Sequence, residues 1–263
     1  MSSHKKILVT GASGLLGRLV VSELEQAGQT AIRAGRKPPA NAAGMASWLK
    51  LDLKTGDGLE DCVSGIATII HCASSTGPFD PEVDVSGTKA LLAAARSAGV
   101  SHMIHVSIVG IDRVPYQYYK IKLQAEEVVR ASGIPFTILR ATQFHEFAEF
   151  LLARLTRLPL VFLPGGIKIQ PVETRAVAKR LVEIAGAEPT NGIREIGGPD
   201  VWELRALVKT WLGAHQKRRL LLPMPGLVLG RLARPLRSGG LTTSVQSELS
   251  LNWEEHLSGS AAG

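Results

Sequence analysis

The stretch that decides the fold is Thr10-Gly11-Ala12-Ser13-Gly14-Leu15-Leu16-Gly17, which directly follows the apolar tripeptide Ile7-Leu8-Val9. Glycines recur at every third position from Gly11, and a helical pattern of apolar residues begins inside the stretch and continues to Ala27. Glycine allows backbone conformations and close approaches that a side chain forbids. An apolar strand that turns through glycines into a helix therefore predicts a turn at which the backbone meets a ligand.

Each glycine has its own physical role in such a turn. Gly11 permits the tight reversal, Gly14 lets the backbone approach a pyrophosphate, and Gly17 allows the helix to pack closely against the strand. Unpaired amides at the N-terminus of the helix then face the phosphates. The turn predicts a dinucleotide site, and a glycine-rich turn without a ligand is the alternative. The residues expected to form this site are Gly11, Ser13, Gly14, Leu15, Leu16 and Gly17.

Short aliphatic runs alternate with helical patterns along the first part of the chain. The runs expected to be strands are Lys6 to Val9, Thr30 to Ala34, Trp48 to Leu51, Ala67 to Ile70, His102 to Val106 and Phe136 to Leu139. The helices expected between them are Leu15 to Ala27, Leu59 to Val63, Val83 to Ala98 and Tyr118 to Ala131. Apolar strands separated by crossover helices form a parallel sheet covered on both faces. The sequence predicts an α/β protein with a Rossmann-type, doubly wound parallel sheet.

The regular alternation of strand and helix patterns becomes weaker after Arg140. The helices expected there are Glu146 to Leu158, Glu173 to Ala187 and Trp202 to Leu212, and the short strands are Ile167 to Val172 and Glu195 to Ile196. The C-terminal residues have weak periodicity and many Gly, Pro and Arg. We expect a dinucleotide-binding core over residues 1–140. A smaller substrate-binding or lid region is expected over residues 141–263, interleaved with the end of the core.

The composition of the 263 residues indicates a folded globular protein, because 45% of them are hydrophobic. This excludes a disordered tail and a disulfide-stapled miniprotein. The two cysteines, Cys62 and Cys72, lack a metal-binding spacing, and the seven histidines form no helical metal pair. We expect two buried thiols and no bound metal.

The formal charge of +7 lies mostly in the C-terminal part of the chain. Residues 1–150 hold 15 basic and 14 acidic side chains, whereas residues 151–263 hold 15 and 9. The stretch from Arg205 to Arg237 contains no Asp or Glu, but it lacks the interleaved aromatic residues typical of nucleic-acid binding. We expect no nucleic-acid partner. The apolar segment Pro223 to Leu229 is predicted to be a mobile flap over a bulky substrate.

No targeting or membrane-spanning segment is recognisable in the sequence. The polar start, Met1 to Lys6, leads into an apolar run too short for a signal peptide. The longest apolar run, Leu220 to Gly230, contains two prolines and is about half as long as the roughly 20 residues of a membrane helix. We expect a cytoplasmic protein, monomeric or homodimeric, that acts on a small molecule.

The residues at the end of the second strand indicate which dinucleotide binds. An acidic residue there would bind the ribose hydroxyls of NAD, but the chain offers Arg33, Arg36 and Lys37. Cationic side chains suit a 2′-phosphate, so NADP is favoured over NAD. An ordinary solvated loop is the alternative for these three residues.

Two further groups of residues follow strands at the same edge of the predicted sheet. Asp52 and Leu53 come after the third strand and are expected at the adenine, unless Asp52 caps the next helix. Cys72, Ala73 and Ser74 come after the fourth strand and are expected to border the nicotinamide.

All three tyrosines fall between Tyr116 and Lys122, and Tyr116 and Tyr118 each have a lysine four residues on. On a helix, positions i and i+4 lie on the same face. Lys122 can therefore lower the pKa of the Tyr118 phenol from about 10 toward neutrality, which makes Tyr118 an acid for carbonyl reduction, and it is also expected to hold the nicotinamide ribose. Ser107, at the end of the fifth strand, is expected to orient the carbonyl by a hydrogen bond.

These motifs resemble those of the short-chain dehydrogenase/reductase superfamily. The likeness rests on the glycine turn, on Val106-Ser107, on Tyr118 to Glu126 and on Leu139-Arg140. It covers about residues 5–255 and points to atypical and extended members, the NAD(P)H-binding proteins similar to nitrogen-metabolite regulators. The segments that extend it toward the C-terminus are Gln170 to Val172, Val177 to Ala178 and Trp253 to Glu255.

The resemblance implies Tyr118 as acid/base, Lys122 as its partner and Ser107 as the group that orients the carbonyl. It favours Tyr118 over Tyr116, because helices of the family begin just before this segment. Gln143, Phe144 and His145 follow the sixth strand and are weaker candidates for the substrate pocket, with packing or helix capping as the alternative.

The activity implied is that of an NAD(P)-dependent oxidoreductase that transfers hydride to or from a carbonyl or quinone-type substrate. The expected substrate is bulky and hydrophobic, and analogy points to a polycyclic aromatic compound of secondary metabolism. Two other functions stay open at this point. One is a non-catalytic NAD(P)H-binding redox sensor or regulator, and the other is a sugar-nucleotide epimerase-like enzyme.

Overall fold

The computed structural model describes residues 6–37, 48–75 and 80–260. The chain divides into two compact units, which are described separately. Unit 1 consists of Met1–Ser107, Lys120–Leu139 and Val177–Arg194. Unit 2 consists of Ile108–Tyr119, Arg140–Ala176 and Glu195–Gly263.

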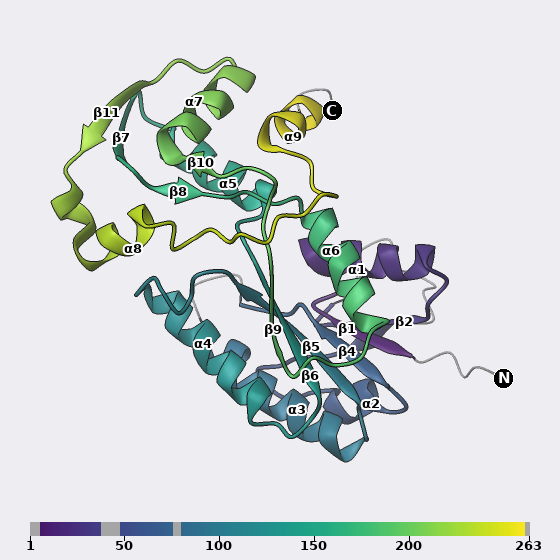
Figure 1. The fold of residues 1–263 in the computed structure, drawn as a ribbon. Helices are drawn as coiled ribbons and strands as arrows, with labels where there is room; N and C mark the ends of the chain where they lie inside the picture. The colour runs from purple at the N-terminus through teal and green to yellow at the C-terminus, as the bar shows by residue number, and fades with distance from the viewer. Residues whose placement is uncertain (1–5, 38–47, 76–79, 261–263) are drawn as a thin grey trace. The chain divides into compact units, whose positions relative to one another are not determined.

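The main sheet has seven strands within the described residues, in the order β3-β2-β1-β4-β5-β6-β9 (Figure 1). The strand pairs β1/β2, β1/β4, β2/β3 and β4/β5 are all parallel. Because the order runs outward from β1 in both directions, the sheet is doubly wound and the predicted Rossmann-type α/β fold is confirmed. The strands are β1 (Ile7–Thr10), β2 (Ala31–Gly35), β3 (Trp48–Lys50), β4 (Thr68–His71), β5 (His102–Ile108), β6 (Phe136–Ala141) and β9 (Gly192–Ile196).

Helices cover the sheet because its strands are apolar on both faces. One face carries Leu8, Ile69 and Met103, which pack with Leu91 of α3 and Val129 of α4 in a single buried cluster. Figure 1 shows α3 and α4 along this side of the sheet. The helices are α1 (Leu15–Gln26), α2 (Leu59–Val63), α3 (Thr88–Ser97), α4 (Gln117–Arg130) and α6 (Thr174–Ala185), and a π-helical turn, η1 (Glu82–Gly87), precedes α3.

The register of the strands brings their carboxyl ends to one edge. Thr10, the last residue of β1, pairs with Ala34 of β2 and with His71 of β4. His71 in turn pairs with His105, the middle residue of β5. The loops that follow these strands therefore lie at the same edge, which is where open α/β sheets bind their ligands.

Unit 2 contains two small sheets and a separate core. Strands β7 and β11 pair in parallel, and β8 and β10 pair antiparallel. The core is formed by α5, β7, α7 and α9 around the fully buried Trp211 and Trp253. The elements are α5 (His145–Leu155), β7 (Leu160–Pro164), β8 (Lys168–Ile169), β10 (Trp202–Glu203), α7 (Leu204–Ala214), β11 (Leu220–Met224), the 3-10 segment η2 (Gly226–Leu232), α8 (Ala233–Arg237) and α9 (Trp253–Ser260).

Unit 2 differs from the sequence-based expectations in several elements. Pro223 and Met224, predicted to be part of a mobile flap, belong to β11, where they pair with Leu163 and Pro164 of β7. Proline is tolerated there because β11 pairs with β7 alone in this two-stranded sheet of the described chain, so its other side needs no backbone donor. The strand expected over residues 167–172 is only β8, and the helix expected from Trp202 begins at Leu204, after β10.

No helix in the described ranges combines the length and the apolar character needed to span a bilayer.

Candidate functional site

The glycine turn has the geometry that its sequence predicts. Gly11 has φ +64°, and a Cβ atom there would lie 2.8 Å from the backbone of Ala73. A Cβ atom at Gly17 would lie 2.2 Å from the carbonyl oxygen of Gly11. Both positions exclude any other residue, the first also by its left-handed backbone, because the strand, the turn and the helix touch there.

Gly14 is exposed and less crowded than Gly11 and Gly17. A Cβ atom added to it would meet only the carbonyl oxygen of Gly11, at 3.2 Å, within 4 Å. Gly14 is also the N-cap of α1, which has no side-chain cap and no acidic residue in its first turn. The amides of that turn thus lack an intrahelical acceptor, and the positive end of the helix dipole is uncompensated. The turn fits the pyrophosphate of a dinucleotide.

Of the other residues predicted at this turn, Ser13 and Leu15 are exposed, whereas Leu16 is buried. Ser13 and Leu15 therefore lie where their backbone amides are open to a ligand. Leu16 packs into the core and can contribute its backbone only.

The three cations predicted to select the cofactor lie in two different environments. The guanidinium of Arg33, within β2, forms an ion pair with Glu25 of α1, and its side chain is only 13% exposed. Arg36 and Lys37 follow the last residue of β2 and are exposed. These two are the better placed to meet a 2′-phosphate, because a side chain bound to a carboxylate must first give up that partner.

Asp52 organises the turn that contains it. Its carboxylate accepts a hydrogen bond from the backbone N–H of Lys54 at 2.9 Å, and its own N–H donates to the carbonyl of Asp57 at 3.0 Å. Asp52 is half-buried and Leu53 is buried. Their contact with an adenine stays a prediction.

A buried ion pair lies below the carboxyl ends of β4 and β5. Nζ of Lys122 lies 3.9 Å from Oδ1 of Asp84, and the two side chains are 5% and 1% exposed. Nζ also donates to the carbonyl of Val106, at 3.3 Å. Burial lowers the pKa of Lys122, and the carboxylate of Asp84 opposes that shift.

Asp84 was not among the predicted site residues, although it connects several of them. Its carboxylate accepts hydrogen bonds from the hydroxyl of Ser74, at 2.6 Å, and from the backbone N–H of Ser75, at 3.2 Å. Its carbonyl accepts one from the Thr88 hydroxyl, at 2.8 Å. Asp84 therefore holds the loop after β4 and Lys122 together. A signal was present in the sequence, since Asp84 shares one helical stripe with the buried Thr88 and Leu91.

Two histidines beside this pair are buried and neutral. Nδ1 of His71 lies 2.7 Å from the Thr10 hydroxyl, and Nε2 lies 3.0 Å from the Thr88 hydroxyl. Burial, reinforced by the charge of Lys122, lowers the pKa of His71 to about 3. The same causes hold the pKa of His105, whose ring centroid is 5.4 Å from that of His71, well below its ordinary value. Both histidines beside the charged Lys122 are therefore uncharged.

The cysteine at this edge is not reactive. Burial raises the pKa of the Cys72 thiol to about 12. Cys72 and Ala73 are half-buried, and the N–H of Ala73 donates to the Thr10 hydroxyl at 3.4 Å. A protonated thiol is neither a nucleophile nor a metal ligand, so Cys72 can border a ligand only as a small apolar group.

Ser107 has a buried hydroxyl with no hydrogen-bond partner among the described residues. An unpaired hydroxyl in the interior is costly, and such groups are enriched where a ligand supplies the partner. This observation agrees with the predicted contact between Ser107 and a substrate carbonyl.

Helix α4 distinguishes the two tyrosine and lysine pairs. It begins at Gln117, so Tyr118 and Lys122 are one helical turn apart on α4, whereas Tyr116 precedes the helix. Tyr118 is half-buried and Lys122 is buried, while Tyr116 and Lys120 are exposed. The preference for Tyr118 over Tyr116 agrees with this helix boundary and stays a prediction.

The three residues predicted at the substrate lie in unit 2 and are largely engaged there. The amide of Gln143 donates to the carbonyl of Leu241 at 3.4 Å, and Phe144 is the N-cap residue of α5. His145 is fully buried, with its ring centroid 4.5 Å from that of His256 and 5.6 Å from that of Trp253. Burial lowers the pKa of His145 to about 3. Its surroundings favour packing over contact with a substrate.

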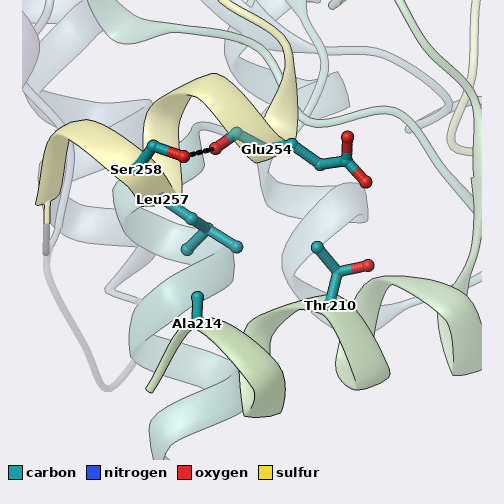
Figure 2. A pocket seen from close by; sticks show the side chains of 5 residues that line it. All are labelled: Thr210, Ala214, Glu254, Leu257 and Ser258. Atoms are coloured by element: carbon teal, nitrogen blue, oxygen red, sulfur yellow. Dashed lines mark hydrogen bonds between the residues drawn. The ribbon is translucent and has the colours of Figure 1, made fainter. Parts of the chain in front are cut away.

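Two cavities of unit 2 contain none of the predicted site residues. The smaller one, about 330 Å³, lies between α7 and α9 and is shown in Figure 2. Ala214 and Leu257 form its apolar wall, and Thr210 and Glu254 supply its polar groups. The larger one, about 420 Å³, is lined by α7, β11 and the loop between them.

Comparison with known proteins gives relatives of more than one kind. The chain is 26% identical over 207 residues to the Photosystem II assembly factor Ycf39 of Trieres chinensis, covering 74% of the chain and 65% of the relative. It is 31% identical over 143 residues to the (4-alkanoyl-5-oxo-2,5-dihydrofuran-3-yl)methyl phosphate reductase of Streptomyces griseus, covering 52% of the chain and 48% of the relative. In both cases less than two thirds of the relative's length is matched.

Solved structures with the same fold include oxidoreductases and an epimerase. A nucleoside-diphosphate-sugar epimerase from Staphylococcus aureus superposes with a TM-score of 0.80 at 17% identity, covering 96% of this chain and 99% of that one. The Citrobacter sp. triphenylmethane reductase complexed with NADP(H) gives 0.77 at 19% identity, with 97% and 99% covered. The NADPH-dependent quinone oxidoreductase of Escherichia coli gives 0.77 at 19%, with 96% and 99% covered.

The family itself is shown by a family-level match over more than half of the chain. The NAD(P)H-binding family matches residues 11–162, which include the glycine turn, Asp84, Tyr118 and Lys122. The expected membership of an NAD(P)H-binding family is confirmed, and the narrower likeness to nitrogen-metabolite regulators stays a prediction. The glycine turn, which fits a pyrophosphate, lies at the start of the matched residues. Because the match covers more than half of the sequence, the chain belongs to the NAD(P)H-binding family.

Proposed function

We propose that the protein is an NAD(P)H-dependent oxidoreductase that transfers hydride between the nicotinamide and a bulky, hydrophobic carbonyl or quinone-type substrate. The observation that carries this proposal is the buried Lys122 ammonium one helical turn after the half-buried Tyr118 on α4. A cation in this position stabilises a phenolate and so makes the phenol a stronger acid. The glycine turn supplies the second requirement, a place for the dinucleotide.

In the direction of reduction, each residue has a distinct task. The nicotinamide, when bound, supplies the hydride that the carbonyl carbon receives. Tyr118 donates its phenolic proton to the carbonyl oxygen, so that a ketone becomes the alcohol; a quinone becomes a hydroxydienone, which tautomerises to the hydroquinone. Lys122 stabilises the resulting phenolate, and Asp84 keeps Lys122 in place. Ser107 donates a hydrogen bond that orients the carbonyl before transfer.

We further propose a preference for NADPH over NADH. It rests on the exposed Arg36 and Lys37 directly after β2. Their charges complement a 2′-phosphate, and no acidic residue stands beside them in the sequence to bind the ribose hydroxyls of NADH.

The proposed substrate class draws support from the names of similar proteins and remains an analogy. Neighbours in fold reduce quinones and triphenylmethane compounds, and one relative reduces a phosphorylated butenolide with an alkanoyl chain. These substrates share a conjugated or carbonyl acceptor next to a large apolar body. A polycyclic aromatic compound belongs to the same class.

The decisive experiment compares Tyr118→Phe with Tyr116→Phe. NADPH oxidation is measured against a panel of quinones and aromatic ketones, whose reduction requires a proton on the carbonyl oxygen. Loss of a general acid lowers kcat by about 10² to 10⁴-fold. We therefore expect Tyr118→Phe to lose at least about 100-fold in kcat, with unchanged affinity for NADPH, and Tyr116→Phe to stay within about twofold. Undiminished turnover by Tyr118→Phe would refute the assignment.

A second function is favoured by one comparison. The relative from Trieres chinensis is an assembly factor, and a dinucleotide site alone would serve a redox sensor or regulator that binds a protein partner. This alternative predicts tight binding of NADPH with no turnover of any member of the panel. An epimerase-like reaction is the remaining alternative, and it predicts turnover of a nucleotide sugar without net oxidation of NADPH.

A further inference from the structure

The larger cavity of unit 2 carries an unusual concentration of one charge. Five of its lining side chains are cationic: Arg205, Lys209, Lys217, Arg218 and Arg219. No acidic side chain lines it, and the whole sequence from Arg205 to Arg237 contains none. The smaller cavity in Figure 2 has the opposite character, with the carboxylate of Glu254 and no cation.

Three of the five cations contact neutral groups. Nε of Arg219 donates to the carbonyl of Thr156 at 2.8 Å, and Nη2 of Arg205 donates to the carbonyl of Leu221 at 3.1 Å. Nζ of Lys217 lies 4.7 Å from the ring centroid of Trp211. The structure gives none of the five an ion pair with a carboxylate of the described residues. Arg205, Lys217 and Arg219 are thus positioned by groups that do not neutralise their charge.

A purely structural role does not account for this charge. Helix α7 ends at Ala214, and Lys217, Arg218 and Arg219 follow it closely. Cations stabilise the carboxyl end of a helix, but the dipole there is equivalent to only about half a negative unit charge. The end of α7 can therefore balance about one of the five cations. Three of the five are exposed, and the charges not balanced in this way create a positive potential at this surface that attracts anions.

We propose that this cavity binds a small phosphorylated molecule that carries at least two negative charges. Guanidinium and ammonium groups are the usual partners of phosphate oxygens. The volume of about 420 Å³ lies in the range of small-molecule sites, about 300 to 1,000 Å³. Leu212, Leu220 and Leu221 line the same cavity and offer an apolar surface to the rest of the ligand. None of these residues belongs to the candidate active site, so the proposal stands apart from the proposed reaction.

The test uses the full-length chain with inorganic tripolyphosphate as the probe. Binding is measured by isothermal titration calorimetry at 150 mM KCl, with NADPH present in excess over the protein so that the probe does not report on the dinucleotide turn. The double variant Lys209→Gln/Arg218→Gln removes two lining charges. The matched control Arg231→Gln/Arg234→Gln removes two exposed charges of the same segment that do not line the cavity.

We expect the first double variant to weaken binding at least tenfold and the control to weaken it less than twofold, with equal thermal midpoints. Equal weakening in both variants would show a general attraction of polyanions to a basic surface and would overturn the proposal. So would the absence of binding at millimolar probe. The affinity of a hexaglutamate peptide is measured by competition with tripolyphosphate. If the peptide bound more tightly than tripolyphosphate, the cavity would be assigned to an acidic protein segment instead, which also contradicts the proposal.

Discussion

Replacing Asp84 with asparagine tests whether this carboxylate keeps the Lys122 ammonium charged inside the protein. The two charged groups are 3.9 Å apart, and both side chains are almost fully buried. At this distance and an effective dielectric constant of about 20, two unit charges attract each other by about 4 kcal/mol. Asparagine preserves the size of the side chain and an oxygen for Ser74 and Ser75, but it removes the attraction. We expect the free energy of unfolding at pH 7 to fall by about 3 to 4 kcal/mol.

The loss depends on pH in a direction that the pKa of Lys122 decides. Burial already lowers this pKa in the folded protein, and Asp84 counteracts the effect. Without Asp84, the folded-state pKa falls further below that of the unfolded chain. At pH values between the folded-state and the unfolded-state pKa of Lys122, the unfolded chain binds more protons than the folded protein. The free energy of unfolding therefore increases with pH in that window. The deficit of Asp84→Asn relative to the wild type is therefore larger at pH 7 than at pH 9.5.

Urea unfolding followed by far-ultraviolet circular dichroism at both pH values measures this deficit. Asp57→Asn is the matched control, since Asp57 lies 3.7 Å from Lys50 with both side chains exposed, and it should cost less than about 1 kcal/mol. The double variant Asp84→Asn/Lys122→Met removes both charges and should recover part of the loss. A deficit below about 1 kcal/mol at pH 7, or one that is equal at pH 7 and pH 9.5, would refute the reasoning.

Two further predictions concern the dinucleotide. Arg36→Ala should weaken NADPH binding about tenfold or more, measured by cofactor fluorescence, while NADH binding changes less than twofold; an equal loss for both cofactors would contradict the assignment of Arg36 to the 2′-phosphate. Gly17→Ala should lower the free energy of unfolding by about 2 kcal/mol or more, because its methyl group meets the Gly11 carbonyl oxygen at 2.2 Å. Gly14→Ala places its methyl group near a single atom, at 3.2 Å, so it should destabilise the protein less than Gly17→Ala but weaken NADPH binding more. A larger loss of stability in Gly14→Ala, or a larger loss of NADPH affinity in Gly17→Ala, would argue against the geometry proposed for the turn.

The sheet of unit 1 could be predicted because its signals are local. Each of the strands β1, β4 and β5 is a short aliphatic run followed by a helical pattern, and the glycines define the first turn without reference to the rest of the chain. Repeated strand and helix units then permit few topologies, since crossovers are right-handed. The fold followed from pattern alone.

The pairing of β7 with β11 could not be predicted in the same way. Each strand contains a proline, each is five residues long, and α6, α7 and other elements separate them in sequence. Because proline is disfavoured in strands, the local sequence predicts a flap at Pro223 and Met224. What stabilises β11 is its partner and the core around Trp211, and neither is visible in the local sequence.

The site shows the same division between local and long-range information. The spacing of Tyr118 and Lys122 is a property of one helix, and the sequence displays it directly. The role of Asp84 depends on a contact with Lys122 across the fold, and a carboxylate on a helix is ordinarily solvated. Its place on a buried helical stripe was the single local indication of a partner.

Electrostatics explains why this one acidic residue is so important for the proposed chemistry. Burial disfavours charge on every basic group beneath the carboxyl edge of the sheet, and it leaves His71 and His105 neutral. The same burial acts on Lys122, which is as deeply enclosed. Lys122 differs from the histidines in having a carboxylate 3.9 Å from its nitrogen. If Tyr118 is an acid tuned by a neighbouring cation, its acidity depends on Asp84 through Lys122. A substitution at Asp84 should thus reduce the rate of proton transfer through its effect on Lys122.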